Sequence, residues 1–282
     1  MRTIHELLRE TADAFVSCGW MEPRREAETL LCELLHCSRS FLYLNREQFL
    51  TVQEWQRCRS WIERRLRGEP LAYLSGRIEF YGCTLAVTPA VLVPRPETEL
   101  LVDKIVNSLK KESLQGRVLW DLCCGSGCIG IALKKAFPSL AVYLSDLSVE
   151  AVALAAQNAA ANGVAVTVLH GDLFTPFLGM KAHYVVCNPP YISEEEYATL
   201  DRGVKDYEPR LALVGGNSGL ELYERLACDL SRHLHPKAKV WLEIGYRQGE
   251  TVPSLFRTIH WRKRELSHDW AGHPRFFLLE NE

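Results

Sequence analysis

The sequence has no long unbroken run of apolar residues and no strong excess of one charge. Its longest uncharged stretch, residues 151–171, contains Gln157, Asn158 and Gly163, and is typical of a helix, a turn and a strand rather than a membrane span. The 282 residues carry 33 basic and 35 acidic side chains, a net charge of -2, which gives no general attraction to phosphate backbones or anionic membranes. We therefore expect no membrane partner and no direct binding of nucleic acid.

The ten cysteines include no C-x-x-C pair, and several lie inside apolar segments. This pattern disfavours a structural zinc ion and indicates reduced thiols. Charged residues at Glu6, Arg9 and Glu10 occupy the region where a signal peptide would need an apolar core. We therefore expect a cytoplasmic protein without a bound metal ion.

Residues 1–72 show helical patterns. Ile4, Leu7 and Leu8 recur at helical spacing, and Thr51 with Glu54 forms a capping box, which is a strong signal for the start of a helix. The segment has eleven arginines, no lysine and eleven acidic residues, so it is neutral as a whole. We expect a small helical domain that docks a protein substrate.

Residues 73–93 and 94–282 show strand patterns. Apolar residues alternate in the first segment, which predicts a β-hairpin linker. In the second segment strand-like and helical stretches alternate, which predicts an α/β domain with a mostly parallel, seven-stranded sheet covered by helices. The last two strands are joined by a short link and are expected to pair antiparallel at one edge. The expected strands are residues 117–121, 141–145, 165–170, 183–187, 239–244, 262–267 and 275–280.

A glycine-rich turn follows the first of these strands. Gly125, Gly127 and Gly130 have the G-x-G-x-x-G spacing, and Asp146 lies about 20 residues further on, where a carboxylate can bind ribose hydroxyls. These residues alone fit NAD or another adenosine cofactor. Asp121, at the mouth of the turn, would repel a pyrophosphate, whereas S-adenosylmethionine has an ammonium and a sulfonium and no phosphate. The sequence therefore favours S-adenosylmethionine.

Acidic residues follow three successive strands. Asp121, Asp146 and Asp172 stand at the carboxyl ends of strands, which meet at one edge of a parallel sheet. We expect Asp121 to face the methionine amino group, directly or through water, Asp146 to face the ribose and Asp172 to face the adenine amino group. A single aspartate there is more often a turn or cap residue, so this prediction depends on all three together.

The tetrapeptide Asn188-Pro189-Pro190-Tyr191 follows the fourth strand. The Asn188 side-chain oxygen and the Pro189 carbonyl can accept two N–H groups of a planar nitrogen, which aims this weak nucleophile at a methyl carbon. Proline adds no competing N–H and stiffens the turn, and Tyr191 can pack on the flat face of the target. The alternative interpretation is that the tetrapeptide is only a turn that ends the strand, with no catalytic role. The position over the predicted cofactor crevice favours a substrate-binding role for all four residues and a catalytic role for Asn188, Pro189 and Tyr191.

With these residues in place, the chain resembles the HemK/PrmC family, the glutamine N5-methyltransferases that act on peptide-chain release factors. The resemblance covers essentially the full length. Besides the tetrapeptide, it rests on residues 68–76 with Glu79-Phe80, on residues 93–99, and on residues 208–213 followed by Gly215-Gly216 and Gly219-Leu220.

The resemblance implies a class I, Rossmann-like methyltransferase domain that uses S-adenosyl-L-methionine and releases S-adenosyl-L-homocysteine. It also implies that the helical domain helps to dock class I release factors, and that the target is the glutamine of their GGQ motif. A plain turn into a helix is the alternative reading for the motif at Arg95-Pro96. Carried over to this sequence, the cofactor contacts fall on Cys123, Cys124, Gly125, Ser126, Gly127, Asp146, Asp172, Leu173 and Asn188, and in the bordering motif on Arg95 and Pro96.

Two cysteines depart from the family pattern. Cys123 stands where the loop usually has its first glycine, and Cys124 stands where threonine is usual. A Cβ has a cost where the backbone approaches a ligand closely, so the resemblance leaves the effect of this pair on cofactor binding open. We expect oxidation of the pair to weaken cofactor binding. A third departure, Ser218 in place of aspartate, is mild because both residues cap helices.

Alternative functions share much of this pattern. A glutamine in a ribosomal protein, or the adenine amino group in nucleic acid, presents a similar planar nitrogen to Asn188. The neutral helical domain and the absence of a recognisable DNA-reading module argue against nucleic acid. A cofactor-sensing protein that does not methylate is a further alternative, which the complete Asn188 tetrapeptide disfavours. The sequence leaves open whether residues 193–219, where Ser193 and Glu196 form a capping box, close over the site.

Overall fold

The computed structural model describes residues 2–257 and 261–282, and within them the chain forms two compact units. The first unit contains the residues up to Gly76 together with Arg202–Tyr207. The second unit contains the remainder, with Arg77–Asp201 as its longest continuous part. Nothing in the pattern of residues 202–207 indicates that this short segment belongs with the N-terminal helices.

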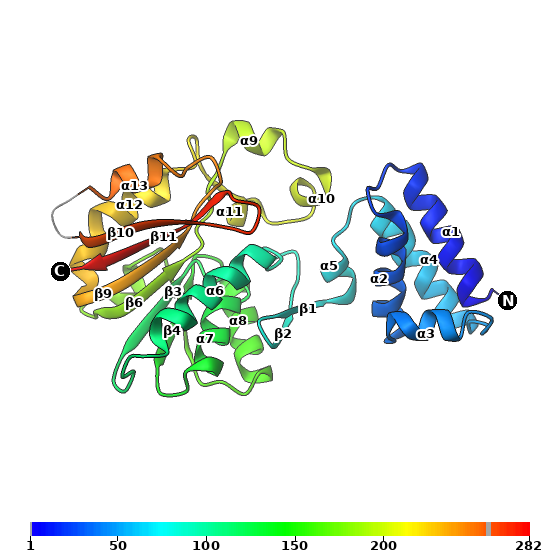
Figure 1. Ribbon diagram of the computed structural model, residues 1–282, viewed down its shortest axis with the longest axis horizontal. Helices are drawn as coiled ribbons and strands as arrows, with labels where there is room; N and C mark the ends of the chain where they lie inside the picture. Colours follow the sequence, from blue (N-terminus) through cyan, green and yellow to red (C-terminus); the bar gives the residue numbers. More distant parts are fainter. Residues whose placement is uncertain (1, 258–260) are drawn as a thin grey trace. The chain divides into compact units, whose positions relative to one another are not determined.

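The first unit is helical, as its sequence pattern predicts (Figure 1). Its helices bury an apolar core that includes Leu7, Phe15 and Leu30. The predicted capping box at Thr51 is confirmed, because the Thr51 hydroxyl accepts from the Glu54 N–H and the Glu54 carboxylate accepts from the Thr51 N–H. The helices are α1 (Ile4–Ser17), α2 (Pro23–Leu35), α3 (Arg39–Leu44), α4 (Val52–Leu66) and α5 (Leu71–Ser75), with α10 (Arg202–Lys205) from the returning segment.

The second unit is built on the predicted seven-stranded sheet (Figure 1), in the order β10-β11-β9-β6-β3-β4-β5. The five strands from β9 to β5 run parallel, and β11 with β10 forms the predicted antiparallel hairpin at one edge. The strands are β3 (Val118–Leu122), β4 (Ala141–Asp146), β5 (Thr167–His170), β6 (Ala182–Cys187), β9 (Leu234–Glu243), β10 (Trp261–His268) and β11 (Pro274–Asn281).

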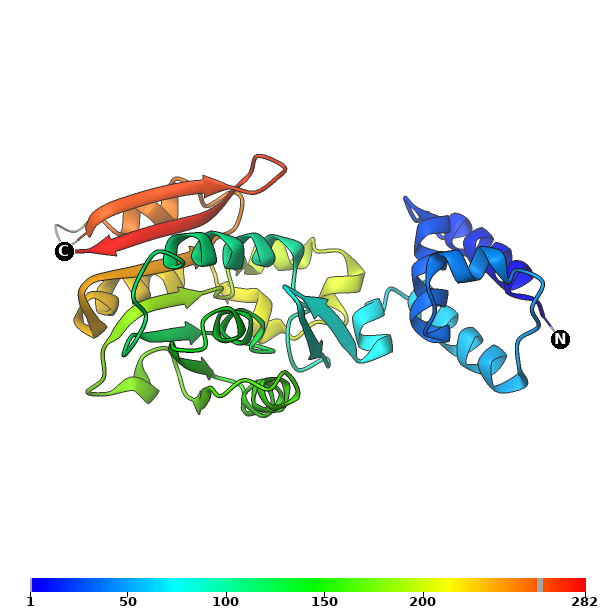
Figure 2. The ribbon, with the colours of Figure 1, turned by 60° about the horizontal axis from the view of Figure 1, so that its bottom comes forward.

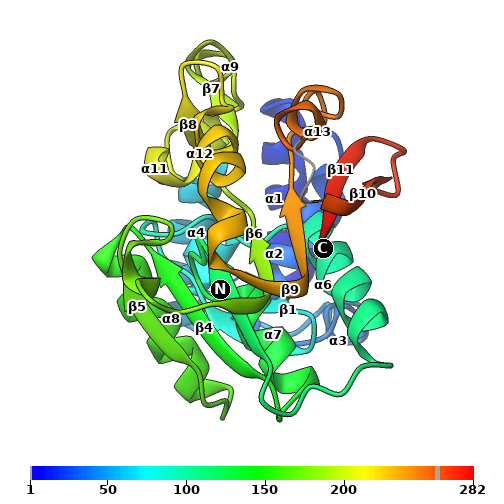
Figure 3. The ribbon, with the colours of Figure 1, turned by 90° about the vertical axis from the view of Figure 1, so that its left-hand side faces the viewer.

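Helices cover both faces of this sheet (Figures 2 and 3). Side chains alternate across each strand, so that in β3 Leu119 packs toward α6, α7 and α8 while Trp120 packs toward α12 and α13. The sheet is therefore buried on both sides, as the continuous apolar strands require. The helices are α6 (Pro96–Leu109), α7 (Cys128–Ala136), α8 (Val149–Ala161), α12 (Glu221–Asp229) and α13 (Thr251–Leu255), with the short 3-10 helices η1 (Thr175–Phe177) and η2 (Leu230–His233).

The predicted hairpin is also confirmed, as β1 (Arg77–Phe80) and β2 (Cys83–Ala86) pair antiparallel. It is attached to α8, where the Asn158 side chain accepts from the Ala86 N–H and donates to the Ala86 carbonyl. The chain then continues from residue 87 to the start of α6 without a further strand.

A second small sheet follows the tetrapeptide, and the sequence did not indicate it. The strands β7 (Ile192–Ser193) and β8 (Val214–Gly216) pair in parallel, so the chain returns beside the tetrapeptide after an excursion through α9 (Glu194–Ala198), α10 and α11 (Arg210–Leu213). The predicted capping box of Ser193 and Glu196 starts α9. Within the described residues, no helix combines the length and the apolar character needed to cross a bilayer.

Candidate active site

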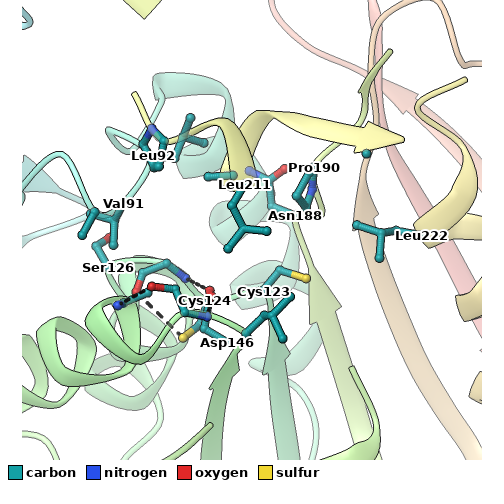
Figure 4. A pocket seen from close by; sticks show the side chains of 18 of the residues that line it. Val91, Leu92, Cys123, Cys124, Ser126, Asp146, Asn188, Pro190, Leu211 and Leu222 are labelled. Atoms are coloured by element: carbon teal, nitrogen blue, oxygen red, sulfur yellow. Dashed lines mark hydrogen bonds between the residues drawn. The ribbon is translucent and has the colours of Figure 1, made fainter. Parts of the chain in front are cut away.

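A cavity of about 640 Å³ lies at the carboxyl ends of β3, β4, β5 and β6 (Figure 4). This is the edge at which open parallel sheets bind their ligands. Figure 4 shows Val91 and Leu92 on one side of the cavity, with Asn188 and Pro190 on another. The residues expected from the sequence that line it are Cys123, Cys124, Gly125, Ser126, Asp146, Asp172, Leu173, Asn188 and Pro190. Those expected there that are not among its lining residues are Asp121, Gly127, Arg95, Pro96, Pro189 and Tyr191.

The glycine-rich turn has the shape that its spacing predicts. Gly125 and Gly127 adopt left-handed backbone angles, with φ of +53° and +80°, and the turn closes when the Gly127 N–H donates to the Cys124 carbonyl at 2.8 Å. Gly130 lies in the first turn of α7, where a Cβ would meet Leu144 Cδ2 at 2.1 Å. The first two glycines therefore make the turn, and the third lets α7 pack closely on the sheet.

Asp146 is fixed on the wall of the cavity. Its Oδ2 accepts from the Gly125 N–H at 2.8 Å, and its Oδ1 accepts from the Ser148 N–H at 2.9 Å. These two bonds tie the end of β4 to the glycine turn and set the direction of the carboxylate. Because each carboxylate oxygen has a second lone pair, Asp146 can still accept from ligand hydroxyls.

Asp121 lies behind the turn rather than at its mouth. Its side chain is 1% exposed, and its Oδ2 accepts from the Gly130 N–H at 2.8 Å. The other oxygen, Oδ1, is buried without a hydrogen-bond partner. Burial, with the charge of Asp146 nearby, raises the pKa of Asp121 to about 7. An unpartnered buried acceptor next to the turn suits a cationic ligand group, although Asp121 itself does not line the cavity.

Asp172 has a partner that the sequence did not reveal. Its Oδ2 accepts from Arg225 Nη2 of α12 at 2.7 Å, and both side chains line the cavity. The neighbouring Leu173 is 6% exposed, adopts a left-handed φ of +45° and also lines the cavity. The cavity floor near β5 therefore has an acidic and a basic group rather than a lone carboxylate.

The tetrapeptide is divided between the cavity and the core. Asn188 and Pro190 line the cavity, whereas Tyr191 packs on the apolar cluster under α12, and burial raises its pKa to about 12. Gln248 holds this turn in place, because its Nε2 donates to the Tyr191 carbonyl at 3.0 Å and to the Gly219 carbonyl at 3.1 Å. No pattern in the sequence marks Gln248 as part of the site.

Arg95 connects two of the motifs that define the family resemblance. Its Nη2 forms an ion pair with Glu208, whose side chain is 1% exposed, and Glu208 Oε2 also accepts from the Val93 N–H at 3.3 Å. Pro96 occupies the first turn of α6, in keeping with the plain turn into a helix that the sequence left open. Arg95 thus fixes the segment that borders the cavity, and Pro94 and Thr98 are the residues of this motif that line it.

The segment after the tetrapeptide forms one wall of the cavity. Leu211, Ala212, Val214 and Gly215 are among the lining residues. In Figure 4 the Leu211 side chain extends toward the turn that carries Cys123 and Cys124. Part of the segment at residues 193–219 therefore borders the site.

The two unusual cysteines both line the cavity. Cys123 adopts a φ of +55°, the left-handed conformation in which glycine has no steric cost. Cys124 is 6% exposed, and burial raises the pKa of its thiol well above the ordinary value. The Cys123 side chain also contacts the buried thiol of Cys187 at the end of β6. Among the residues that the structure describes, all ten cysteines are free.

Comparison with known proteins identifies both parts of the chain. Residues 6–76 match the family model of the PrmC N-terminal domain, and residues 96–215 match that of the methyltransferase small domain. The hMettl16 catalytic domain, solved in complex with the MAT2A 3'UTR hairpin 6, has a TM-score of 0.57 at 14% identity and covers 81% of this chain and 82% of that chain. A methyltransferase from Pyrococcus furiosus has a TM-score of 0.52 at 18% identity and covers 71% of this chain and 89% of that one. These likenesses confirm the predicted class I methyltransferase fold.

Relatives with higher identity match nearly the whole chain. A release factor glutamine methyltransferase of Chlamydia trachomatis serovar L2 is 44% identical over 280 residues, which cover 98% of this chain and 94% of that protein. Another, of Thermodesulfovibrio yellowstonii, is 35% identical over 257 residues, which cover 91% of this chain and 92% of that protein. The chain therefore belongs to the family of release factor glutamine methyltransferases.

Proposed function

We propose that this protein transfers a methyl group from S-adenosyl-L-methionine to the side-chain amide nitrogen, N5, of the glutamine in the GGQ motif of class I peptide-chain release factors. One observation carries the proposal: Asn188, at the end of β6, lines the same cavity as the glycine turn and Asp146. The tetrapeptide that suits a planar nitrogen thus faces the place where an adenosine cofactor fits. The named relatives support the same substrate.

The cavity suits S-adenosyl-L-methionine in size and in chemistry. Its volume of about 640 Å³ is in the range of pockets that enclose small cofactors. Asp146 would hold the ribose hydroxyls, and Asp172 with Leu173 would contact the adenine. The buried Oδ1 of Asp121 provides negative charge behind the turn for the methionine end. When bound, this cofactor supplies an electrophilic methyl group on a positively charged sulfur and leaves as S-adenosyl-L-homocysteine.

The chain's own contribution to the reaction is orientation. An amide nitrogen is a weak nucleophile because its lone pair is delocalised, so its direction decides whether it reacts. In the proposal, the Asn188 Oδ1 and the Pro189 carbonyl accept the two N–H groups of the glutamine side chain and turn its nitrogen toward the methyl donor. No general base is needed before attack, because the alkylated nitrogen is cationic and loses its proton readily.

The helical unit has a separate role in the proposal. We assign residues 1–72 to docking of the release factor, outside the cavity that lies wholly in the second unit. Because the thiols are free in the structure and release factors act in translation, the proposed activity takes place in the cytoplasm. Neither a metal ion nor a nucleic acid has a part in this scheme.

Mass spectrometry tests the proposal. Purified class I release factor, bulk ribosomal proteins and DNA are each incubated with the protein and S-adenosyl-L-methionine. We expect one methyl group on the glutamine of the GGQ motif and none on the other two samples. Methylation of a ribosomal protein or of adenine instead would contradict the proposed substrate, but it would leave the assignment of the active site unchanged.

The variant Asn188→Ala tests the site itself. We expect it to bind S-adenosyl-L-methionine nearly as well as the parent by calorimetry, and to lose most of the methyl transfer, because the acceptor that orients the nitrogen is gone. Asn107→Ala is the matched control, since Asn107 is exposed on α6 and its side chain bonds to its sequence neighbours Asp103 and Lys110. Equal turnover in Asn188→Ala and the parent would refute the assignment of Asn188.

A further inference from the structure

Asn188 has a buried acidic neighbour that the proposed chemistry does not use. In the parallel pair of β6 and β9, Cys187 is opposite Leu242, so Asn188 and Glu243 follow as the next pair at the same edge of the sheet. Side chains of paired residues on parallel strands point to the same side. The register alone therefore brings the Glu243 carboxylate next to the Asn188 amide.

The contacts of Glu243 agree with this register. The Glu243 side chain is 2% exposed and does not line the cavity, whereas Asn188 does. Asn188 therefore lies between Glu243 and the cavity. Glu243 Oε2 accepts from the Thr98 hydroxyl at 2.8 Å, and a side-chain interaction with the Asn188 amide lowers the pKa of the carboxylate. The end of β9 is itself fixed, because the Tyr223 hydroxyl donates to the Glu243 carbonyl at 2.7 Å.

The chemistry of this pair determines which way the amide points. An ionised carboxylate accepts hydrogen bonds and cannot donate one, so Asn188 must present its Nδ2–H group to Glu243. The amide is planar, and its oxygen is then directed away from Glu243. An inverted amide would place its oxygen against a buried negative charge and leave its N–H group facing the substrate.

We propose that Glu243 is a positioning residue that fixes the orientation of the Asn188 amide, so that Oδ1 faces the cavity and accepts an N–H of the substrate. The inference rests on the proposed function only for the role of Asn188. Thr98, which also lines the cavity, takes part indirectly, because its hydroxyl donates to Oε2 of the carboxylate.

If Glu243 orients Asn188, turnover should depend on whether Glu243 is protonated. Burial raises its pKa to about 7, Glu97 of α6 acts in the same direction, and Arg275 of β11 acts against it. The other titratable groups that interact with it are Tyr191, Tyr223 and Cys128. A protonated Glu243 can donate to the Asn188 oxygen, which permits the inverted amide. Turnover should therefore fall as pH drops through about 7.

The variant Glu243→Gln tests the proposal, since it retains the shape of the side chain and removes its charge. At saturating S-adenosyl-L-methionine we expect kcat near pH 8 to fall about 10-fold, with the Kd for the cofactor unchanged. The fall in kcat below pH 7 that we expect for the parent should disappear in the variant. Saturation with the cofactor matters, because Asp121 also titrates near pH 7 and its effect is on cofactor binding.

Two further variants make the test decisive. Thr98→Val keeps the carboxylate and removes one hydrogen bond that lowers its pKa, so the midpoint of the pH profile should move upward even if Glu243→Gln does not fold. Glu112→Gln is the matched control, because Glu112 accepts from the Tyr184 hydroxyl toward the opposite end of β6. We expect it to keep the kcat and the pH profile of the parent.

Two results would overturn the positioning role. One is a Glu243→Gln protein with the parent's kcat and pH profile. The other is a lower kcat with the parent's pH profile, which is the result that a purely structural role gives. Methylation of an acceptor other than a release factor would contradict the proposed substrate, and the same comparison would then be made on that acceptor, so the two failures are distinguishable.

Discussion

A β-carbon added to Gly215 would lie 2.3 Å from the carbonyl oxygen of Pro190. Gly215 is in the middle of β8, which pairs with β7 directly after the tetrapeptide. No side chain fits at that distance, so the absence of one lets the returning segment pack directly on the backbone of the tetrapeptide. Gly219 makes a similar approach, with its added carbon 2.3 Å from the Tyr191 carbonyl oxygen.

The variant Gly215→Ala should therefore displace the turn that carries Asn188. We expect kcat for methyl transfer to fall about 100-fold, because a shift of about 1 Å in a positioning group has that effect. The measurement is the rate of methylation of release factor at saturating cofactor. Circular dichroism of the variant would show whether the fold is kept.

Gly179→Ala is the comparison for this variant. Gly179 has a left-handed φ of +77° and nothing within 4 Å of an added carbon, so alanine should lower the free energy of unfolding by about 1 kcal/mol and leave kcat unchanged. A Gly215→Ala protein that methylates as fast as Gly179→Ala would show that close packing on Pro190 does not position the tetrapeptide.

Features that depend on neighbours in the sequence could be predicted without the structure. Apolar alternation located β3, β4 and β6 to within one residue, and the spacing of Gly125, Gly127 and Gly130 indicated the turn. These features can be predicted because the backbone conformation of a turn and the alternation of buried and exposed residues are both set within a short segment of the sequence. The same alternation predicted a mostly parallel sheet with an antiparallel hairpin at one edge, whereas the order of its strands was not predicted.

Contacts between distant segments could not be predicted in this way. Asp172 pairs with Arg225, 53 residues away, and Arg95 pairs with Glu208, 113 residues away. No spacing encodes such pairs, because tertiary packing decides them. Asp121 illustrates the same limit, since its place at a strand end was predictable, whereas its burial behind the turn depends on how closely α7 packs.

Cys123 offers a direct test of backbone strain in the cofactor turn. Its φ of +55° is left-handed, and a residue with a Cβ pays a steric cost of about 1 kcal/mol there. We expect Cys123→Gly to have a free energy of unfolding about 1 kcal/mol higher than Cys123→Ala, as measured by urea denaturation. Both variants lack the thiol, so their difference isolates the backbone conformation from the contact with Cys187.

The sign of that difference is informative. At an ordinary extended or helical position, glycine is less stable than alanine, because its unfolded chain has more conformational freedom. A Cys123→Ala protein more stable than Cys123→Gly would therefore mean that residue 123 is not left-handed in solution. We also expect Cys123→Gly to bind S-adenosyl-L-methionine at least as tightly as the parent, which calorimetry can measure.

Asp121 should make the stability of the cofactor-free protein depend on pH. Its pKa in the folded state is about 7, above the ordinary value of 3.8, because the carboxylate is buried. Between these two values the folded protein binds the proton more tightly than the unfolded chain. The free energy of unfolding should therefore fall as pH rises through this window, and the fall should be complete above about pH 7.

Asp121→Asn should remove most of this pH dependence, because an asparagine oxygen can still accept from the Gly130 N–H and carries no charge. Between about pH 5 and about pH 8 we expect the parent to lose about 1 to 3 kcal/mol and Asp121→Asn to lose clearly less, as measured by urea denaturation. Glu243, whose buried carboxyl also has a pKa of about 7, contributes to the part that remains, and His183, whose pKa burial lowers to about 4, acts in the opposite direction.

Ionisation of Asp121 should have opposite effects on the two properties. It lowers the stability of the cofactor-free protein and strengthens cofactor binding. If the unpartnered Oδ1 faces positive charge on S-adenosyl-L-methionine, binding favours the ionised form, so the parent should bind more weakly as pH falls below about 7. Asp121→Asn should bind weakly at every pH. Asp103→Asn is the control, since Asp103 is exposed on α6 and is not among the residues that line the cavity. Equal, pH-independent affinity in the parent and in Asp121→Asn would show that Asp121 has only a structural role in the turn.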